Sequence, residues 1–181
     1  TNSGYLHGLN VQYSTTSDIN RYDRLTEKTS SGLKFAEWYY GPQKWFMANA
    51  QLTRLSSASS IHDKVKLSVA YQNYQESRND RNLYSENLRT RKENVDVLSA
   101  NVDFEKDLSE KSEIFYGFEY LLNTVGSKGK QSNILNSQSE PIASRYPDGS
   151  NWHSIASYLS YKYKPNKKFS FQSGLRYNYI I

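Results

Sequence analysis

The fold is decided by the stretch QKWFMANAQLTRL, residues 43–55. One side of an extended strand here carries apolar side chains (Phe46, Ala48, Ala50 and Leu52), and the other carries mostly polar ones (Trp45, Met47, Asn49, Gln51 and Thr53). A pleated strand imposes this period of two on its side chains. The stretch therefore predicts an antiparallel β-strand with one apolar and one polar face.

Six further segments of similar length show the same alternation: residues 4–14, 64–75, 94–104, 113–123, 152–163 and 168–180. The polar stretches that join the seven segments alternate between long (15–33, 76–92 and 124–150) and short (56–63, 105–111 and the turn at 165–166). Outer-membrane β-barrels join their strands in this way, with long outer loops and short periplasmic turns. We predict an all-β fold, the antiparallel wall of a transmembrane β-barrel, with 76–92 and 124–150 as outer loops.

Strand length separates this prediction from a soluble all-β domain. A dozen residues at ~3.3 Å each and ~40° tilt span roughly 30 Å, enough for an apolar band of ~25 Å. Strands of soluble sandwiches are mostly about five or six residues long. A soluble all-β binding domain stays as an alternative, in which the charged faces are simply solvated.

Composition agrees with a barrel and excludes a helical membrane protein. Only 36% of the 181 residues are hydrophobic and the mean hydropathy is −0.83, whereas 16 residues are Tyr. No run approaches the ~18 apolar residues of a spanning helix. A barrel strand needs only every second residue to be apolar, and tyrosine suits both strands and membrane interfaces.

Charge and motifs exclude several other functions. The net charge of +5 comes from basic residues scattered among 18 acidic ones, which is unlike a nucleic-acid-binding surface. The chain has no cysteine, and His7, His62 and His153 form no spaced pair, so we expect no metal site. No catalytic motif is present, and we expect neither an enzyme nor a resident cofactor.

The polar faces predict a wide, wet interior. Charged residues occupy positions opposite the apolar ones: Lys66, Asp103, Glu119, Lys162 and Arg176. A small closed barrel cannot bury so many charges without close pairing. Seven strands also leave two edges that lipid does not tolerate. We therefore expect residues 1–181 to be part of a larger barrel domain, with its remaining strands and any plug domain elsewhere.

One region carries a family resemblance. Residues 19–25 read INRYDRL and residues 35–43 read FAEWYYGPQ. This pair of motifs resembles TonB-dependent outer-membrane receptors of the haemoglobin/transferrin/lactoferrin type, strongest over residues 19–56; Asn20 replaces the proline of many relatives. The resemblance implies a 22-stranded barrel with an N-terminal plug that contacts the TonB complex. It also implies uptake of haem, a haem-protein or a ferric chelate, in the outer membrane of a Gram-negative bacterium. The partners it implies are outer-membrane lipid and the haem- or iron-carrying ligand or a host carrier protein. The scattered charges noted above give no reason to expect nucleic acid as a partner.

The candidate ligand-binding residues are Arg21, Tyr22, Asp23, Arg24, Trp38, Tyr39, Tyr40 and His153. Arg21, Asp23 and Arg24 are expected to form an ion-paired loop, which gives the loop its shape whether or not it contacts ligand. Trp38, Tyr39 and Tyr40 are expected in the aromatic girdle of the outer interface. His153 is expected near the outer rim. A porin-like or adhesin barrel without energy coupling is the alternative function.

Overall fold

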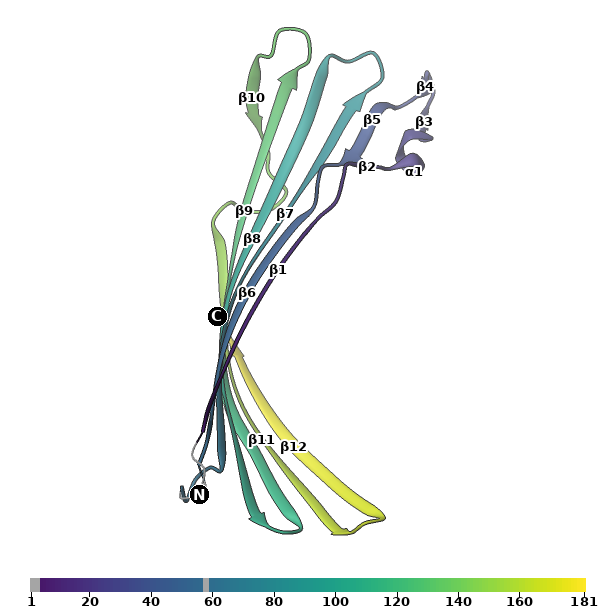
Figure 1. Cartoon of the computed structure of the whole chain (residues 1–181). Helices are drawn as coiled ribbons and strands as arrows, with labels where there is room; N and C mark the ends of the chain where they lie inside the picture. The colour runs from purple at the N-terminus through teal and green to yellow at the C-terminus, as the bar shows by residue number, and fades with distance from the viewer. Residues whose placement is uncertain (1–3, 57–58) are drawn as a thin grey trace.

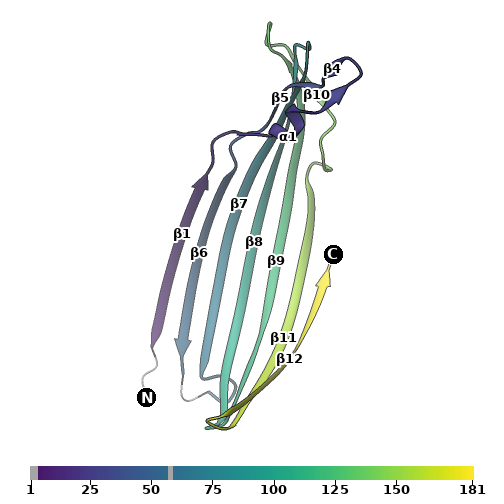
Figure 2. The same ribbon diagram turned by 90° about the vertical axis from the view of Figure 1, so that its right-hand side faces the viewer.

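Seven long antiparallel strands form one curved sheet (Figure 1). The structure is a computed structural model and describes residues 4–56 and 59–181. In their order across the sheet the strands are β1 (Tyr5–Thr15), β6 (Lys44–Leu55), β7 (Lys64–Asn82), β8 (Asn87–Ser109), β9 (Ser112–Asn133), β11 (Ser150–Asn166) and β12 (Phe169–Ile180). All seven predicted strands are present, and sequential strands are neighbours, as Figure 2 shows face on. The predicted antiparallel all-β arrangement is confirmed.

Smaller elements gather at the upper end of the sheet in Figure 1. There β5 (Phe35–Tyr40) pairs with the upper part of β7, and β2 (Ile19–Asn20) pairs with β5. Beside them lie the short helix α1 (Tyr22–Leu25) and the hairpin of β3 (Lys28–Thr29) and β4 (Gly32–Leu33). β10 (Ser139–Ile142) pairs with the upper part of β9. Among the described residues, no helix has the length and apolarity needed to cross a bilayer.

Two predicted outer loops are mostly strand, which is a correction. Residues 76–82 continue β7 and residues 87–92 begin β8, so the connection shrinks to residues 83–86. Residues 124–133 continue β9, and β10 folds back on them within the predicted outer loop 124–150. The prediction failed because it required an apolar face, whereas strand pairing needs only backbone hydrogen bonds where both faces meet water. The lower turn predicted at 105–111 is likewise tighter, because β8 ends at Ser109 and β9 begins at Ser112.

The long central strands extend far beyond one bilayer. β7, β8 and β9 contain 19, 23 and 22 residues, against 11 in β1 and 12 in β12. At ~3.3 Å per residue and ~40° tilt, 23 residues rise roughly 58 Å, about twice the hydrocarbon thickness. The upper halves of these strands therefore project into water.

The pairing register aligns the apolar side chains in rows across the sheet. One complete row is Leu9, Ala50, Val69, Ala100, Tyr120, Ile155 and Tyr179. We call this side the apolar face; on β8 and β9 its apolar band runs from Phe104 and Tyr116 up to Leu98 and Leu122. The side chains of this face are open: Leu98 is 43%, Phe118 57% and Leu175 80% exposed. No second layer covers them within the described residues, which excludes the core of a soluble sandwich.

The opposite side, the polar face, carries the predicted charges, and several are paired. Arg176 binds Glu119, which also accepts a hydrogen bond of 3.1 Å from Asn101. Lys162 binds Glu113, and Lys64 binds Glu105 at 3.1 Å. This pattern fits a lumen lined by hydrogen-bonded polar groups rather than an apolar core.

One glycine allows a long cross-strand contact on the polar face. The ring of Tyr158 on β11 lies over Gly117 on β9, and its hydroxyl donates to Asp103 on β8. A Cβ on Gly117 would lie 2.6 Å from Tyr158 Cζ and 2.4 Å from the Val102 carbonyl oxygen. Only glycine leaves room for this contact, which links three neighbouring strands.

Candidate functional site

Two arginines and two aromatic rings form a cluster on the polar face at the upper end of the sheet. We call Arg21, Trp38, Tyr40 and Arg78 the upper cluster. The Arg21 guanidinium lies 5.3 Å from the Trp38 ring centroid and 5.5 Å from that of Tyr40, and Arg78 lies 5.3 Å from the Tyr40 ring. The two rings meet edge to face at 5.2 Å. Such cation–π contacts contribute about 0.5–1 kcal/mol each at exposed sites.

The backbone explains why these side chains meet. In the pairing of β5 with β7, Tyr40 is opposite Arg78 and Trp38 is opposite Asp80, so both rings stand on the polar face. The backbone N–H of Arg21 donates to the Trp38 carbonyl oxygen at 3.0 Å, which holds Arg21 beside both rings. Gly41 follows this strand with no room for a side chain, because an added Cβ would lie 2.1 Å from Ser77 Oγ.

Arg21 is fixed by two partners. Its Nε and Nη2 donate to the two carboxylate oxygens of Asp23 at 2.8 and 2.6 Å, and its Nη1 donates to the Tyr40 hydroxyl at 2.7 Å. The hydrogen bond from Arg21 lowers the pKa of Asp23 to about 2, and the same bond raises the pKa of the Arg21 guanidinium. The predicted ion-paired loop therefore forms through Arg21 and Asp23, and it stays charged over the physiological pH range.

Arg78 retains binding capacity. Its nearest carboxylate among the described residues, Glu76, lies 3.8 Å from Nη2, beyond hydrogen-bond distance, so the exposed part of the guanidinium is not committed to a carboxylate. The side chains of Arg21 and Arg78 are each 33% exposed. The upper cluster can therefore offer guanidinium donors and flat aromatic faces to an anionic ligand, which matches how arginine recognises carboxylates.

A second charged group adjoins the cluster on the polar face. Glu76 on β7 is opposite Glu93 on β8, which is opposite Ser127 on β9. Arg145, from the loop of residues 143–149, reaches over these strands to Glu76 at 3.6 Å and Glu93 at 3.8 Å. The loop is held by hydrogen bonds from the Ser127 N–H to Asp148 Oδ1 (2.9 Å) and from the Tyr146 N–H to Ser127 Oγ (3.2 Å).

Glu93 is the most unusual carboxylate of this region. It is only 4% exposed, and neither carboxylate oxygen has a hydrogen-bond partner among the described residues. Burial raises the pKa of Glu93, while the charge of Arg145 opposes that rise. Arg145 of the 143–149 loop thus compensates the negative charge of the buried Glu93.

The structure separates the other predicted ligand-binding residues from the upper cluster. Tyr22 is 72% exposed at the start of α1, and Arg24 pairs with Glu27 instead. Tyr39 stands on the other side of β5, opposite Asn79, and burial raises the pKa of its hydroxyl. The aromatic-girdle interpretation is wrong for Trp38 and Tyr40, because their rings contact arginines on the polar face.

His153 also lies away from the cluster. It is opposite Leu122 on the apolar face, and its Nδ1 is 2.8 Å from the Tyr120 hydroxyl. A role for His153 in contacting haem stays a prediction, but the structure does not bring it near Arg21.

Sequence reasoning missed Glu76, Arg78, Glu93 and Arg145. Glu76, Arg78 and Arg145 lay in predicted outer loops, and Glu93 lay just before the predicted strand 94–104, although Glu76, Arg78 and Asp80 continue the period of two that begins at Lys64. That continued alternation is a signal that could have placed them on the polar face. Nothing in the sequence pairs Arg145 with Glu93, because the contact depends on how the chain folds back after β10.

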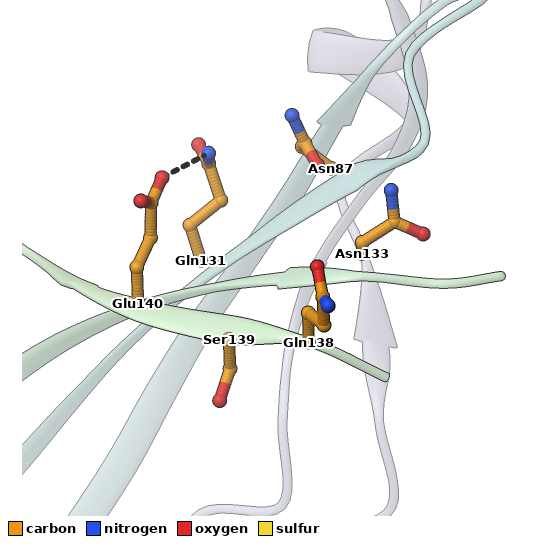
Figure 3. Close-up of a pocket in the computed structure, with 6 residues that line it drawn as sticks. All are labelled: Asn87, Gln131, Asn133, Gln138, Ser139 and Glu140. Carbon is orange, nitrogen blue, oxygen red and sulfur yellow. Dashed lines mark hydrogen bonds between the residues drawn. The ribbon is translucent and has the colours of Figure 1, made fainter. Parts of the chain in front are cut away.

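A separate cavity of about 470 Å³ lies at the tips of the strands (Figure 3). Its lining is entirely polar and consists of Asn87, Gln131, Asn133, Gln138, Ser139 and Glu140. Gln131 Nε2 donates to Glu140 Oε1 of its cross-strand partner at 2.9 Å. This polar lining differs from the mostly apolar lining of small-molecule pockets. Within residues 4–56 and 59–181, no three His, Asp or Glu side chains gather as a metal site.

Comparison with known proteins identifies a family. The chain matches the outer membrane protein beta-barrel family over residues 55–181, more than half of its length. The match begins after residues 19–43, which carry the resemblance to TonB-dependent receptors. No curated protein and no solved structure matches the chain.

Proposed function

The chain belongs to the outer membrane protein beta-barrel family, and on that premise we propose that it forms part of the wall of a receptor for TonB-dependent uptake of haem, a haem-protein or a ferric chelate. The family places the chain in the outer membrane of a Gram-negative bacterium. In this orientation the long upper strands face the exterior and the tight lower turns face the periplasm. The polar face then lines the lumen, and the upper cluster lies at its outer mouth.

The upper cluster is the observation that supports the proposal. Haem carries two carboxylates on a flat ring, and many ferric chelates are anionic. Arg21 and Arg78 can bind the negative groups, and the exposed parts of Trp38 and Tyr40 can contact a flat ring. The motifs around Arg21 and Trp38 are also those of the receptor resemblance.

The strand arrangement agrees with a large barrel. β1 and β12 are the two edges of the seven-strand order, and both run from the lower to the upper end (Figure 2). An odd number of further strands is needed to close an entirely antiparallel barrel between two edges of the same direction. A transporter barrel of about 22 strands meets this condition, because 22 − 7 leaves 15.

Ligand binding to the full-length protein in cells tests the proposal. We expect Arg21→Ala combined with Arg78→Ala to weaken binding of haem or a ferric chelate at least about tenfold, because each variant removes a charged hydrogen-bond donor. Arg24→Ala is the matched control, since Arg24 pairs with Glu27 in the same loop. Deletion of Arg21, Tyr22 and Asp23 should act like the double variant.

Uptake distinguishes the proposal from a porin-like or adhesin barrel. A TonB-dependent receptor accumulates ligand only in cells with an intact energy-coupling complex, whereas a porin-like barrel admits it in either case. Unchanged ligand binding in the double variant at normal surface abundance would remove the upper cluster from the ligand site. Uptake that persists without the coupling complex would reject the receptor function.

A further inference from the structure

Three lysines stand together on the apolar face, above the apolar band. Lys92 on β8 is directly opposite Lys128 on β9, and Lys130 lies two residues further along the same face of β9. All three side chains are exposed. Among the described residues, none of the three lysines has a carboxylate within 4.0 Å. Like charges directly opposite each other on antiparallel strands are destabilising. An anion bound between Lys92 and Lys128 would remove that repulsion.

The two opposed lysines border a groove. A hollow of about 370 Å³ is lined by Lys92, Asn94, Gly126, Lys128 and Asp148. Gly126 lines the hollow without a side chain, and an added Cβ there would meet no atom closer than 3.7 Å. Asp148 is the one carboxylate among the lining residues, and its Oδ1 already accepts the Ser127 N–H. The Asn94 Nδ2 already donates one hydrogen bond, to Asp96 Oδ2 at 2.6 Å, on the same face of β8 toward the apolar band. Two ammonium groups and the second amide hydrogen of Asn94 therefore remain for a ligand in the hollow.

The height of the groove above the apolar band can be compared with the thickness of the lipid headgroup layer. Lys92 is six residues above Leu98, the upper end of the continuous apolar band on β8, which corresponds to about 15 Å at ~3.3 Å per residue and ~40° tilt. The headgroup layer of an ordinary bilayer adds only about 5–8 Å to each side of the hydrocarbon. Lysine side chains bend toward the interface, which lowers their ammonium groups by several ångströms. The groove is thus level with a large headgroup that projects beyond that of a phospholipid.

We propose that Lys92 and Lys128, with Asn94 between them and the membrane, bind a phosphate group on the sugar headgroup of an outer-leaflet glycolipid. Lysine binds phosphate as a point charge, and the second amide hydrogen of Asn94, which does not bond Asp96, can be donated to a phosphate or sugar oxygen. The site faces the lipid and is on the opposite side of the sheet from the upper cluster. It depends on the outer-membrane location and not on which ligand the receptor imports.

Binding of a phosphorylated glycolipid to the full-length protein in detergent micelles tests this site. The variant is Lys92→Gln with Lys128→Gln. The control is Lys167→Gln with Lys168→Gln, which removes the same charge from exposed residues of the periplasmic turn between β11 and β12. At about fivefold per lysine near a phosphate-bearing surface, we expect binding about 30-fold weaker in the variant and unchanged in the control.

Two further ligands identify the source of the phosphate. The same glycolipid without its phosphates should bind the wild type as weakly as the phosphorylated form binds the variant, and inorganic phosphate at equal concentration should not compete. Heat-modifiable migration on gels checks that each variant is folded. The proposal is overturned if the variant binds the glycolipid like wild type, if dephosphorylated glycolipid binds equally well, or if inorganic phosphate displaces it.

Discussion

Replacing Arg145 with glutamine should open the 143–149 loop. In the native protein this guanidinium is the positive charge that lies between Glu76 and the buried Glu93. Glutamine keeps most of the side-chain length and removes the charge. The two carboxylates, which are opposite each other on β7 and β8, then repel with only the charges of Arg78, 3.8 Å from Glu76, and Arg91 to offset the repulsion.

The size of the effect follows from the distances. At 3.6 and 3.8 Å and an effective dielectric constant of about 20, each ion pair corresponds to about 4–5 kcal/mol of Coulomb energy. Ordering the arginine side chain and desolvating both partners offset most of this energy. We expect a net loss of about 1–2 kcal/mol in the free energy of loop closure, which is a five- to thirtyfold increase in the open population.

The pH dependence gives a second, independent signature. Because burial raises the pKa of Glu93, the closed loop binds a proton more tightly than the open loop does. Closure is therefore favoured as pH falls, and protonated Glu93 no longer repels Glu76. The difference between Arg145→Gln and wild type should be largest above the raised pKa of Glu93 and should shrink as the pH falls through that pKa.

Hydrogen exchange of the full-length protein measures this opening. The amides of Ser127, Tyr146 and Gly149 are protected by hydrogen bonds that the closed loop makes. In Arg145→Gln they should exchange five to thirty times faster at about pH 7, and adding Glu93→Gln should restore protection. Equal exchange in Arg145→Gln and wild type, or a difference that does not vary with pH, would refute the assigned role of Arg145.

Two further predictions concern the wall itself. Gly117→Ala should destabilise the barrel by about 1–3 kcal/mol, because its Cβ would overlap the Tyr158 ring and the Val102 carbonyl oxygen. The control Gly8→Ala, whose nearest contact is at 3.6 Å, should change the stability little. Urea unfolding of the full-length protein in lipid vesicles compares the two variants, and equal midpoints would contradict the packing at Gly117. In the same assay, Val69→Lys on the apolar face should lower the free energy of unfolding by about 2–4 kcal/mol, while Ser68→Lys on the polar face of the same strand should hardly change it. Similar losses of stability at both positions would mean that one face is not in lipid and the other is not in water.

The extent of the strands shows where sequence reasoning was incomplete. Within the bilayer, one face of each strand must be apolar, so the alternation from Lys64 to Gln75 and from Glu113 to Asn123 is unambiguous. Above the bilayer both faces meet water, and the alternation loses its hydrophobic contrast. Residues 76–82 and 124–133 therefore resemble loops in composition, although the pairing of β7 with β8 and of β8 with β9 continues through them.

The amino-acid sequence by itself determined the seven strands, their order and the division into an apolar and a polar face, because each depends on local period and connection length. The tertiary structure alone decided which charged residues meet. Arg21 reaches Tyr40 across 19 positions, Arg145 reaches Glu93 from a different strand connection, and Lys92 is opposite Lys128 through the register of β8 with β9. Such contacts depend on strand register and on chain reversals, and a change of register by one residue would move each side chain to the other face.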